Sequence, residues 1–293
     1  MTDISNVKSV ATTTAVKQLL RELKLSPNKL LGQNFLVSSE IAERIIRSLK
    51  IDEYGRILEI GAGLGALSGL LAESAASLSL LEVDAKLYRH LCHMFAENSR
   101  VEVIKANALH FDYAAYSSAG CSQDYAIIAN LPYNITSPLL RRLLLYGGSW
   151  RSLTLMIQYE VAQKLLLASK AGASGPLALL AQYIANIEML FTVPKSCFYP
   201  MPQVESAVIH MTRRDQLPFA VGETERFADF LEAAFSHRRK TLVNSLNNAW
   251  GGGAALWRQT LRTCGVDEGR RAEQLSLTEY GALFNEIERL WTL

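Results

Sequence analysis

The stretch Asn-Leu-Pro-Tyr at residues 130–133 has the residue types best suited to chemistry, because it brings a carboxamide, backbone carbonyls and an aromatic ring together. It follows the apolar run YAIIA at 125–129, which predicts a buried strand. An exocyclic amine on a nucleobase is a poor nucleophile, since its lone pair is delocalised into the ring. If the side-chain oxygen of Asn130 and the carbonyl of Leu131 accept its two hydrogens, they stabilise charge that develops as the nitrogen attacks a methyl group, and Tyr133 can stack on the base. The stretch therefore predicts chemistry at an amine without a catalytic His or Cys.

A glycine-rich turn provides the second part of the predicted site. The segment LEIGAGLGALS at 58–68 reads as a strand, a turn and the start of a helix, and Gly61 and Gly63 lie in the turn. Such glycines let the backbone pass close to a ligand at the carboxyl end of a strand, where open α/β sheets bind nucleotides. The spacing differs from the dinucleotide motif, and no Lys-Ser/Thr follows as in a phosphate-binding loop. A pyrophosphate site is therefore not predicted.

An acidic residue strengthens the prediction of a nucleoside site. Glu82 ends the second predicted strand, 21 residues after Gly61, where a carboxylate can accept hydrogen bonds from both ribose hydroxyls. Asn107, after the third strand, is expected to meet an adenine edge. The glycines alone could form only a tight turn, and Glu82 alone could be an exposed strand end. Together they favour nucleoside binding.

Seven short apolar runs alternate with longer helical patterns, which predicts an α/β fold with a mostly parallel sheet and helices on both faces. The runs are RILEI (56–60), SLSLLEV (77–83), VEVI (101–104), YAIIA (125–129), SLTLMI (152–157), IEMLFTV (187–193) and SAVIHM (206–211). After Pro218 helical periodicity replaces the strands. We predict an N-terminal extension over 1–30, with a helix-like stretch from Thr13 to Lys24, a nucleoside-binding domain over 31–212 and a helical domain over 213–293.

Composition restricts the class of protein but not its function. The chain has 293 residues, of which 49% are hydrophobic, and a formal net charge of +2. No apolar run has the length of a membrane-spanning helix, and no signal peptide is visible, so a cytoplasmic location is expected. The cysteines form no Cys-x-x-Cys pair and the histidines show no metal-ligand spacing, so neither a disulfide framework nor a metal site is predicted; the cysteines are Cys92, Cys121, Cys197 and Cys264.

Several of these blocks together resemble the KsgA-type family of ribosomal RNA adenine dimethyltransferases. The blocks are LGQNFL at 31–36, LEIGAGLGALS at 58–68, LEVDAKL at 81–87 and NLPYNITSPLL at 130–140. VPKSCFYPMPQVESAV at 193–208 and AFSHRRKTLVNSL at 234–246 are similar to later blocks of the family. The resemblance spans roughly residues 29–290.

The resemblance implies a Rossmann-like class I methyltransferase domain with a seven-stranded sheet, followed by a helical domain. It implies S-adenosylmethionine as cofactor and dimethylation of N6 on two adjacent adenosines in a hairpin loop near the 3′ end of small-subunit (16S) rRNA. Carried onto this chain, the cofactor site comprises Asn34, Leu36, Gly61, Gly63, Glu82, Asn107 and Asn130. The target amine is expected to be held by Asn130, Leu131, Pro132 and Tyr133, with Phe198 as a second stacking face.

A compact basic cluster is the candidate for RNA phosphate contact. His237, Arg238, Arg239 and Lys240 are adjacent on a predicted helix. Residues 219–293 contain nine Lys/Arg against ten Asp/Glu, so a solvated charge run is the alternative interpretation. The resemblance favours contact with rRNA.

The chain departs from the family pattern at three places. Asn107 and Tyr159 stand where the family usually has Asp and Lys, and SGPLAL from Ser174 replaces a typical Tyr-Gly-x-Leu. An amide oxygen can still accept from adenine, so we expect weaker rather than abolished cofactor binding. The other two changes concern RNA contacts and target choice.

Alternatives to small-subunit methylation remain open on the sequence. A related methyltransferase could act on large-subunit rRNA, as in antibiotic resistance, and a ribosome-assembly or other RNA-binding factor could keep the fold without catalysis. A nicotinamide-dependent oxidoreductase is disfavoured by the glycine spacing. We expect a monomer that acts on small-subunit rRNA or a 30S-type assembly intermediate, in ribosome biogenesis.

Overall fold

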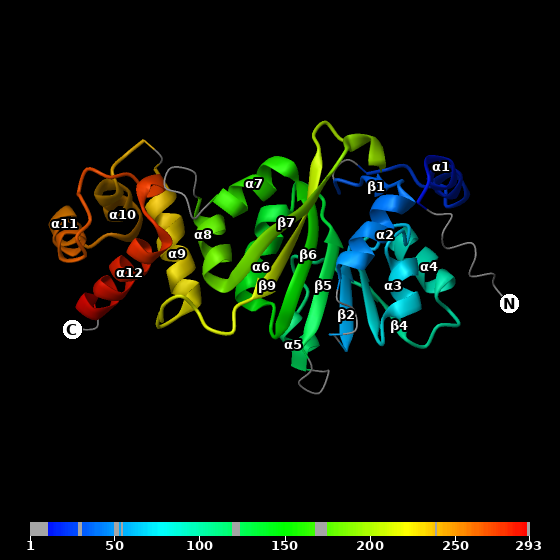
Figure 1. Cartoon of the computed structure of the whole chain (residues 1–293), viewed down its shortest axis with the longest axis horizontal. Helices are drawn as coiled ribbons and strands as arrows, with labels where there is room; N and C mark the ends of the chain where they lie inside the picture. Colours follow the sequence, from blue (N-terminus) through cyan, green and yellow to red (C-terminus); the bar gives the residue numbers. More distant parts are fainter. Residues whose placement is uncertain are drawn as a thin grey trace. The chain divides into compact units, whose positions relative to one another are not determined.

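The computed structural model describes residues 11–28, 31–49, 53, 55–118, 124–167, 175–237 and 239–291. Its centre is a seven-stranded sheet in the order β4-β3-β2-β5-β6-β9-β7 (Figure 1). Strands β4 to β6 are parallel where they pair, and β9 runs antiparallel to β6. The strands are β2 (Arg56–Ile60), β3 (Leu78–Glu82), β4 (Val101–Lys105), β5 (Tyr125–Asn130), β6 (Trp150–Gln158), β7 (Ala185–Val193) and β9 (Ser206–Arg213). The predicted α/β fold and its mostly parallel sheet are confirmed.

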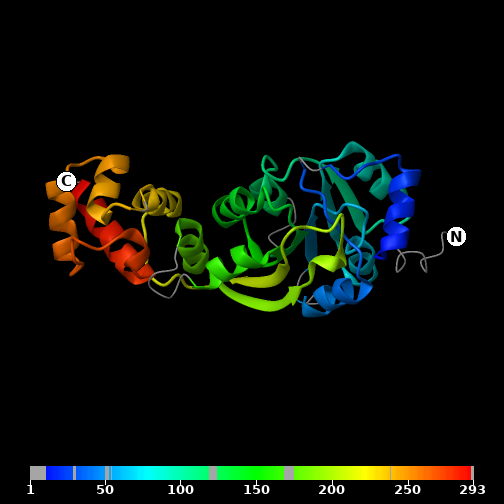
Figure 2. The ribbon, with the colours of Figure 1, turned by 90° about the horizontal axis from the view of Figure 1, so that it is seen from above.

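Strand β3 shows how helices cover both faces of the sheet. Leu78 and Leu80 belong to a buried cluster that includes side chains of α2 (Ser39–Ser48), α3 (Ser68–Ser74) and α4 (Ala85–Met94). Between them Ser79 points to the opposite face, where its hydroxyl accepts a hydrogen bond of 3.1 Å from Tyr116 of α5 (Tyr113–Ser118). Helix α6 (Thr136–Tyr146) lies beside α5, and Figure 2 shows the strands between the two helical layers.

The N-terminal segment is part of the packed structure rather than an appendage. Helix α1 (Thr13–Glu22) begins after Thr12, whose side chain accepts a hydrogen bond from Ala15 N. Its apolar stripe includes Val16 and Leu20, which are both buried. They pack with Phe35, Leu64 and Leu87. Helix α1, which lies within the predicted N-terminal extension of residues 1–30, is therefore packed against the first unit, because burying this stripe stabilises its attachment.

A short second sheet follows α1 and was not predicted. Strand β1 (Phe35–Leu36) pairs antiparallel with β8 (Phe198–Tyr199), which follows the 3₁₀ helix η3 (Lys195–Cys197). In addition, Val37 N donates to the Cys197 carbonyl. This pairing joins two of the sequence blocks that are far apart in the chain.

The backbone contacts divide the chain into two compact units. The first comprises Met1–Ala162 and Glu188–Thr212, and the second comprises Gln163–Ile187 and Arg213–Leu293. Residues 163–187, expected in the nucleoside-binding domain, thus group with the C-terminal helices. The reason is visible in α8 (Pro176–Ile184), where Tyr183 packs its ring against Phe219 and Phe227. The boundary predicted at residue 213 stays a prediction about folding domains.

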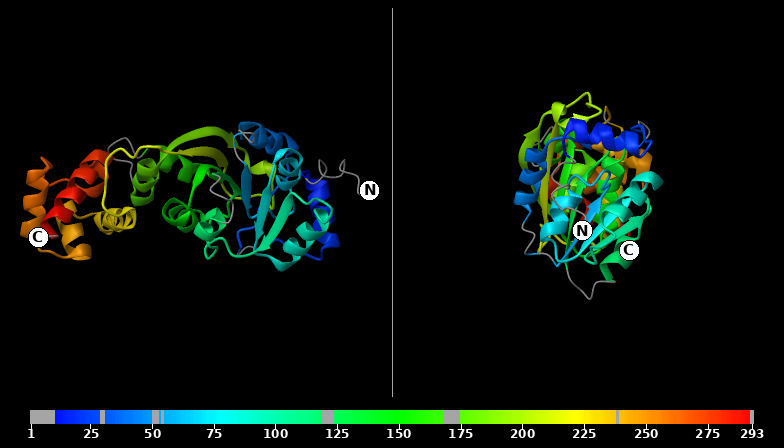
Figure 3. Two further views of the ribbon diagram at one scale, coloured as in Figure 1. Left: turned by 90° about the horizontal axis from the view of Figure 1, so that it is seen from below. Right: turned by 90° about the vertical axis from the view of Figure 1, so that its right-hand side faces the viewer.

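The second unit is built on an aromatic core. The ring of Phe230 contacts the rings of Trp257, Tyr280 and Phe284, which belong to later helices of this unit. Phe227, on the same helix as Phe230, also contacts Phe284. The helices are α9 (Thr224–Phe235), α10 (Leu242–Trp250), α11 (Ala254–Thr263) and α12 (Leu277–Trp291), shown from yellow to red in Figure 3. No helix among the described residues combines the length and the apolar character needed to cross a membrane.

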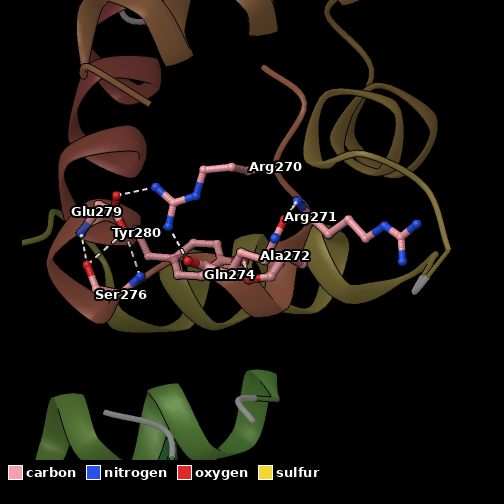
Figure 4. Close-up of polar contacts among 7 residues, drawn as sticks. All are labelled: Arg270, Arg271, Ala272, Gln274, Ser276, Glu279 and Tyr280. Carbon is pink, nitrogen blue, oxygen red and sulfur yellow. Dashed lines mark hydrogen bonds and ion pairs between the residues drawn. The ribbon is translucent and has the colours of Figure 1, made fainter. Parts of the chain in front are cut away.

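A polar network fixes the turn before α12 (Figure 4). The Arg270 guanidinium pairs with the Glu279 carboxylate and donates to the Gln274 carbonyl in η4 (Ala272–Gln274). Tyr280 Oη donates to the Ala272 carbonyl at 2.8 Å. The backbone carbonyl of Arg270 accepts from Leu242 N, so this turn also holds the start of α10.

Candidate active site

A cavity of about 130 Å³ opens at the carboxyl ends of the parallel strands. Its walls come from residues 31–36, from the glycine-rich turn after β2, from the end of β3, from the segment after β4 and from residues 130–135 after β5. It contains ten residues predicted from the sequence: Asn34, Leu36, Gly61, Gly63, Glu82, Asn107, Asn130, Leu131, Pro132 and Tyr133. Parallel strands end at one edge of the sheet, and this explains why the separate blocks meet.

The glycine-rich turn requires glycine because of its backbone conformation. Gly61 and Gly63 have φ of 73° and 60°, in the left-handed region that other residues adopt at a cost. Gly61 N donates to the Leu81 carbonyl at 2.8 Å, which ties the turn to the neighbouring strand. A Cβ on Gly61 would lie 3.9 Å from the Asn130 carbonyl oxygen, so the turn passes close to the end of β5 without a clash.

Glu82 shapes the turn as well as lining the cavity. Its Oε2 accepts from Gly63 N, and its Oε1 accepts from Val83 N and Asp84 N, each at 2.9 Å. Burial raises the pKa of this carboxyl, and the three backbone donors oppose the rise. A carboxylate has about four acceptor positions. Glu82 thus retains acceptor capacity for a hydroxyl group of a ligand.

Glu59 is a cavity residue that the sequence reasoning missed. It lies on β2 two residues before Gly61 and is 2% exposed. Its Oε2 has no hydrogen-bond partner within the described residues. Burial, together with the charge of Glu82, raises the pKa of Glu59 to about 8, although Ser68 opposes the rise. The acidic position in LEIGAG was the sequence signal that could have identified this residue. An acidic residue at that position is, however, equally compatible with an ordinary strand.

The carboxamide of Asn130 is held in one orientation. Its Nδ2 donates to the backbone carbonyl of Asn34 at 3.1 Å, and Asn34 Nδ2 in turn donates to the Gly32 carbonyl at 3.1 Å. With its nitrogen engaged, Asn130 presents Oδ1 as the free end of the group, and the described residues provide no donor to it. An acceptor therefore lines the cavity where the amine was predicted to bind.

The backbone after Asn130 is fixed by its own hydrogen bonds. Leu131 N donates to the Met156 carbonyl of β6 at 3.1 Å, and the Pro132 carbonyl accepts from Ile135 N and Thr136 Oγ1. These bonds engage the Pro132 carbonyl and hold the turn rigid. The Leu131 carbonyl belongs to the backbone between the Leu131 N–H and the Pro132 carbonyl, both of which are hydrogen-bonded.

Tyr133 is anchored through its hydroxyl group. Tyr133 Oη lies 2.7 Å from Oγ of Ser206, the first residue of β9, and the ring is half-buried in the cavity wall. Burial raises the pKa of Tyr133, so the phenol stays neutral near pH 7. Its ring is thus held against rotation, as a stacking surface requires.

Asn107 lies at the edge of the cavity and is exposed. Its Oδ1 already accepts from Leu109 N at 2.9 Å, in a turn that follows β4. A carbonyl oxygen has two lone pairs, so Oδ1 can accept one further hydrogen bond. The expected contact with an adenine amine remains compatible with this geometry.

Phe198 does not line the cavity, which corrects the expectation for this residue. Pairing of β8 with β1 turns its side chain into the core, where it is 4% exposed and packs with Leu36, Met156 and Val208. A side chain enclosed in this way does not offer a stacking face. The assignment of Phe198 as the second stacking residue is not supported by its placement.

Gly32 is a further residue that sequence reasoning missed, although it belongs to the GQNFL block. Its φ is 62°, and a Cβ there would lie 2.8 Å from Asn134 Oδ1 and 3.0 Å from Pro132 Cβ. The loop of residues 31–34 therefore packs directly against the turn after β5. Only the fold brings the two blocks together.

The described residues of the basic cluster, His237, Arg239 and Lys240, are not helical, in contrast to the prediction. Helix α9 ends at Phe235, and His237, Arg239 and Lys240 lie in the connection to α10. The run of polar side chains offers nothing to bury, and Ser236 Oγ bonds back to the Ala233 carbonyl at the helix end. Neither Arg239 nor Lys240 has an ion pair within the described chain.

Other predicted positions stand as follows. Arg238, Ser174, Cys121 and residues 1–10 and 29–30 lie outside the described residues. Tyr159 begins α7 (Tyr159–Leu167), and Gly175 directly precedes α8, which begins at Pro176. Among the described side chains, no group of three or more His, Cys, Asp or Glu could hold a metal ion.

Comparison with known proteins agrees with the fold and with the family resemblance. A family model described as ribosomal RNA adenine dimethylase matches residues 24–289. Ribosomal RNA small subunit methyltransferase A of Pelotomaculum thermopropionicum is 36% identical, with 94% of this chain and 96% of the relative covered. The protein of the same name from Geobacillus thermodenitrificans is 35% identical, with 97% and 99% covered.

Solved structures share the architecture. A dimethyladenosine transferase from Plasmodium falciparum has a TM-score of 0.72 at 20% identity, covering 87% of this chain and 98% of that one. The 23S rRNA methyltransferase ErmE has a TM-score of 0.64 at 22% identity, covering 87% and 100%. These identities show the fold alone. The family match over most of the sequence, together with the site built from its blocks, leads to one conclusion: the chain belongs to the ribosomal RNA adenine dimethylase family.

Proposed function

We propose that this enzyme dimethylates N6 of two adjacent adenosines in a hairpin loop near the 3′ end of small-subunit rRNA. As a family member, the chain is an S-adenosylmethionine-dependent rRNA adenine dimethyltransferase. The choice of the small subunit is supported by full-length relatives that are named small subunit methyltransferases. The number and identity of the adenosines follow from the resemblance in the sequence blocks.

The observation that carries the proposal is the orientation of Asn130. Its Nδ2 is engaged with Asn34, which leaves Oδ1 to accept a hydrogen from the amine. We propose that the Leu131 carbonyl accepts the second hydrogen. Charge that develops on the attacking nitrogen is stabilised by these acceptors. Tyr133, anchored by Ser206, supplies the stacking surface that holds the base.

The cavity fits the cofactor chemically. When bound, S-adenosylmethionine supplies a methyl group activated by a positively charged sulfur. We propose that Glu82 accepts from ribose hydroxyls, that Asn107 meets the adenine and that Gly61 and Gly63 allow close approach of the backbone. The unpartnered buried oxygen of Glu59 suits a cationic group, since ionic pairing would compensate its burial.

We propose that basic side chains of the second unit bind phosphates of the rRNA. Arg239 and Lys240 lie in a connection with no ion pair in the described chain, and Arg238 is adjacent to them in sequence. We propose a monomer that acts on a 30S-type assembly intermediate. An rRNA substrate also favours the cytoplasmic location predicted from the sequence.

Mapping the modified base tests the proposal. The enzyme is incubated with labelled methyl donor and, in separate reactions, with undermethylated small subunits or with large-subunit RNA. We expect label only on the small-subunit RNA, on dimethylated adenosines. Label confined to large-subunit RNA would establish the alternative, the antibiotic-resistance type of reaction.

A further inference from the structure

The loop that joins β8 to β9 exposes two large apolar side chains. Met201 is 61% exposed and Val204 is 45% exposed, and Met201 has the highest exposure of any large hydrophobic residue in the described chain. Single exposed apolar residues are common, whereas exposed apolar residues that lie together mark interaction sites. The loop projects beyond the end of the strands (Figure 1, yellow-green).

This loop is held firmly in place. Pro200 and Pro202 restrict its backbone. Its first end is fixed by the pairing of Tyr199 with Phe35, and its second by Tyr159 N, which donates to the Glu205 carbonyl at 3.0 Å. The apolar side chains are therefore presented by a stiff segment.

The loop is directly connected to the amine site. Val204 lies two residues before Ser206, whose hydroxyl bonds Tyr133 at 2.7 Å. Ser206 pairs with Gln158 at the carboxyl end of β6, beside the strand that ends in Asn130. Met201 and Val204 thus lie on the side of the sheet where the base must enter.

The charge of the loop favours contact with bases rather than phosphates. Residues 200–205 contain no Lys or Arg and one carboxylate, the exposed Glu205. Phosphates would be repelled by this carboxylate, whereas the face of an unstacked base is apolar. A base that leaves its stack to reach an enzyme pocket exposes such faces on its neighbours.

We propose that Met201 and Val204 form an apolar wedge that enters the RNA base stack as the target adenosine leaves it. Insertion of Met, Leu or similar side chains between bases is an established way to compensate lost stacking. The wedge rests on the proposed function, because it requires an RNA adenosine as substrate. It assigns a substrate-contacting role to a loop outside the cavity.

The test compares the full-length enzyme with the double variant Met201→Ser/Val204→Ser. The matched control is Leu217→Ser, an apolar residue of similar exposure (44%) in the other unit. Single-turnover methylation is measured on undermethylated small subunits at saturating cofactor. A hairpin RNA with 2-aminopurine at the target position reports unstacking through its fluorescence.

We expect the double variant to methylate about tenfold more slowly and to give a smaller fluorescence rise. Its affinity for S-adenosylhomocysteine and its thermal midpoint should match those of the wild type. The Leu217→Ser control should keep the wild-type rate.

Two results would overturn the wedge. One is a double variant that methylates within about twofold of the wild-type rate, and the other is a slow double variant with an unchanged fluorescence rise. Failure of the wild-type enzyme to methylate small subunits would instead overturn the proposed function, and the wedge with it.

Discussion

Asn130 Nδ2 donates a hydrogen bond to the backbone carbonyl of Asn34 at 3.1 Å, and this contact joins the two most distinctive blocks of the sequence. Because the nitrogen end of the carboxamide is engaged, the oxygen end is available to an incoming amine. The orientation of one side chain thus depends on a loop almost one hundred residues earlier in the chain.

Replacement of Asn130 tests the amine-acceptor role. We expect Asn130→Ala to lower the single-turnover rate by about 100-fold or more, since it removes an acceptor that acts on developing charge. The fold should remain intact, as judged by circular dichroism and by the thermal midpoint. Asn285→Ala, which removes an amide that bonds the Ala220 carbonyl in the second unit, is the control. An Asn130→Ala enzyme of undiminished activity would falsify the role.

Gly32→Ala should disturb catalysis more than cofactor affinity. The new Cβ would meet Asn134 Oδ1 at 2.8 Å and Pro132 Cβ at 3.0 Å, in a residue with φ of 62°. We expect a loss of about 1–2 kcal/mol in the free energy of unfolding from the backbone conformation. The shifted loop should lower kcat through Asn130, with a smaller change in the Kd of the cofactor measured by calorimetry.

The control for this prediction is Gly175→Ala. Gly175 has an extended φ of −131° and no atom within 4 Å of a built Cβ. The substitution should leave kcat and stability nearly unchanged. Equal effects of the two variants would show that Gly32 has no special role in positioning Asn130.

Glu59 should make stability depend on pH. Its pKa in the folded protein is about 8, above the value of 4.5 for an unperturbed carboxyl. The unfolded state therefore loses its proton first as pH rises, and the free energy of unfolding falls between about pH 4.5 and pH 8, by roughly 1.4 kcal/mol per pH unit at most. Glu59→Gln removes this dependence. Urea unfolding at pH 5, 7 and 9 should therefore show that the free energy of unfolding of the variant increases relative to that of the wild type as pH rises.

Glu279 should give the opposite dependence of stability on pH. Hydrogen bonds from Arg270 and Ser276 outweigh burial and lower the pKa of this carboxyl. Its contribution to stability is present above pH 4.5 and is lost as pH falls through the lowered pKa. Glu279→Gln should therefore be less stable than the wild type at pH 7, with the difference shrinking in acid. A Glu59→Gln variant that followed the same trend would contradict the burial of Glu59.

Helix α1 should support the cofactor site from outside. Leu20 packs with Phe35, Leu64 and Leu87, which also line the cavity. We expect Leu20→Ala to lower the free energy of unfolding by about 2–5 kcal/mol. It should also weaken binding of S-adenosylhomocysteine, because the residues of the cavity wall lose the side chain that packs behind them. Gln18→Ala, on the exposed face of the same helix, should change neither quantity. Unchanged cofactor affinity in a folded Leu20→Ala protein would show that α1 supports only the fold.

The sequence alone was sufficient for the sheet and for most of the cavity. All seven predicted strands are present, with ends that differ by at most two residues. The inner strands were recognisable because a strand buried on both faces is a continuous apolar run, whereas the edge strands β4 and β7 are only partly buried. Gly61, Glu82 and Asn130 were identified by their positions after such runs. Parallel strands end at one edge, so the predicted residues had to converge.

Contacts between segments that are distant in sequence could be learned only from the tertiary structure. The pairing of β1 with β8 turned Phe198 into the core, and the packing of Val16 made α1 part of the first unit. The close approach of Gly32 to Pro132 likewise has no local signal. Local periodicity reports which face of an element is buried but not against what, and side-chain orientation at the site depends on that missing partner.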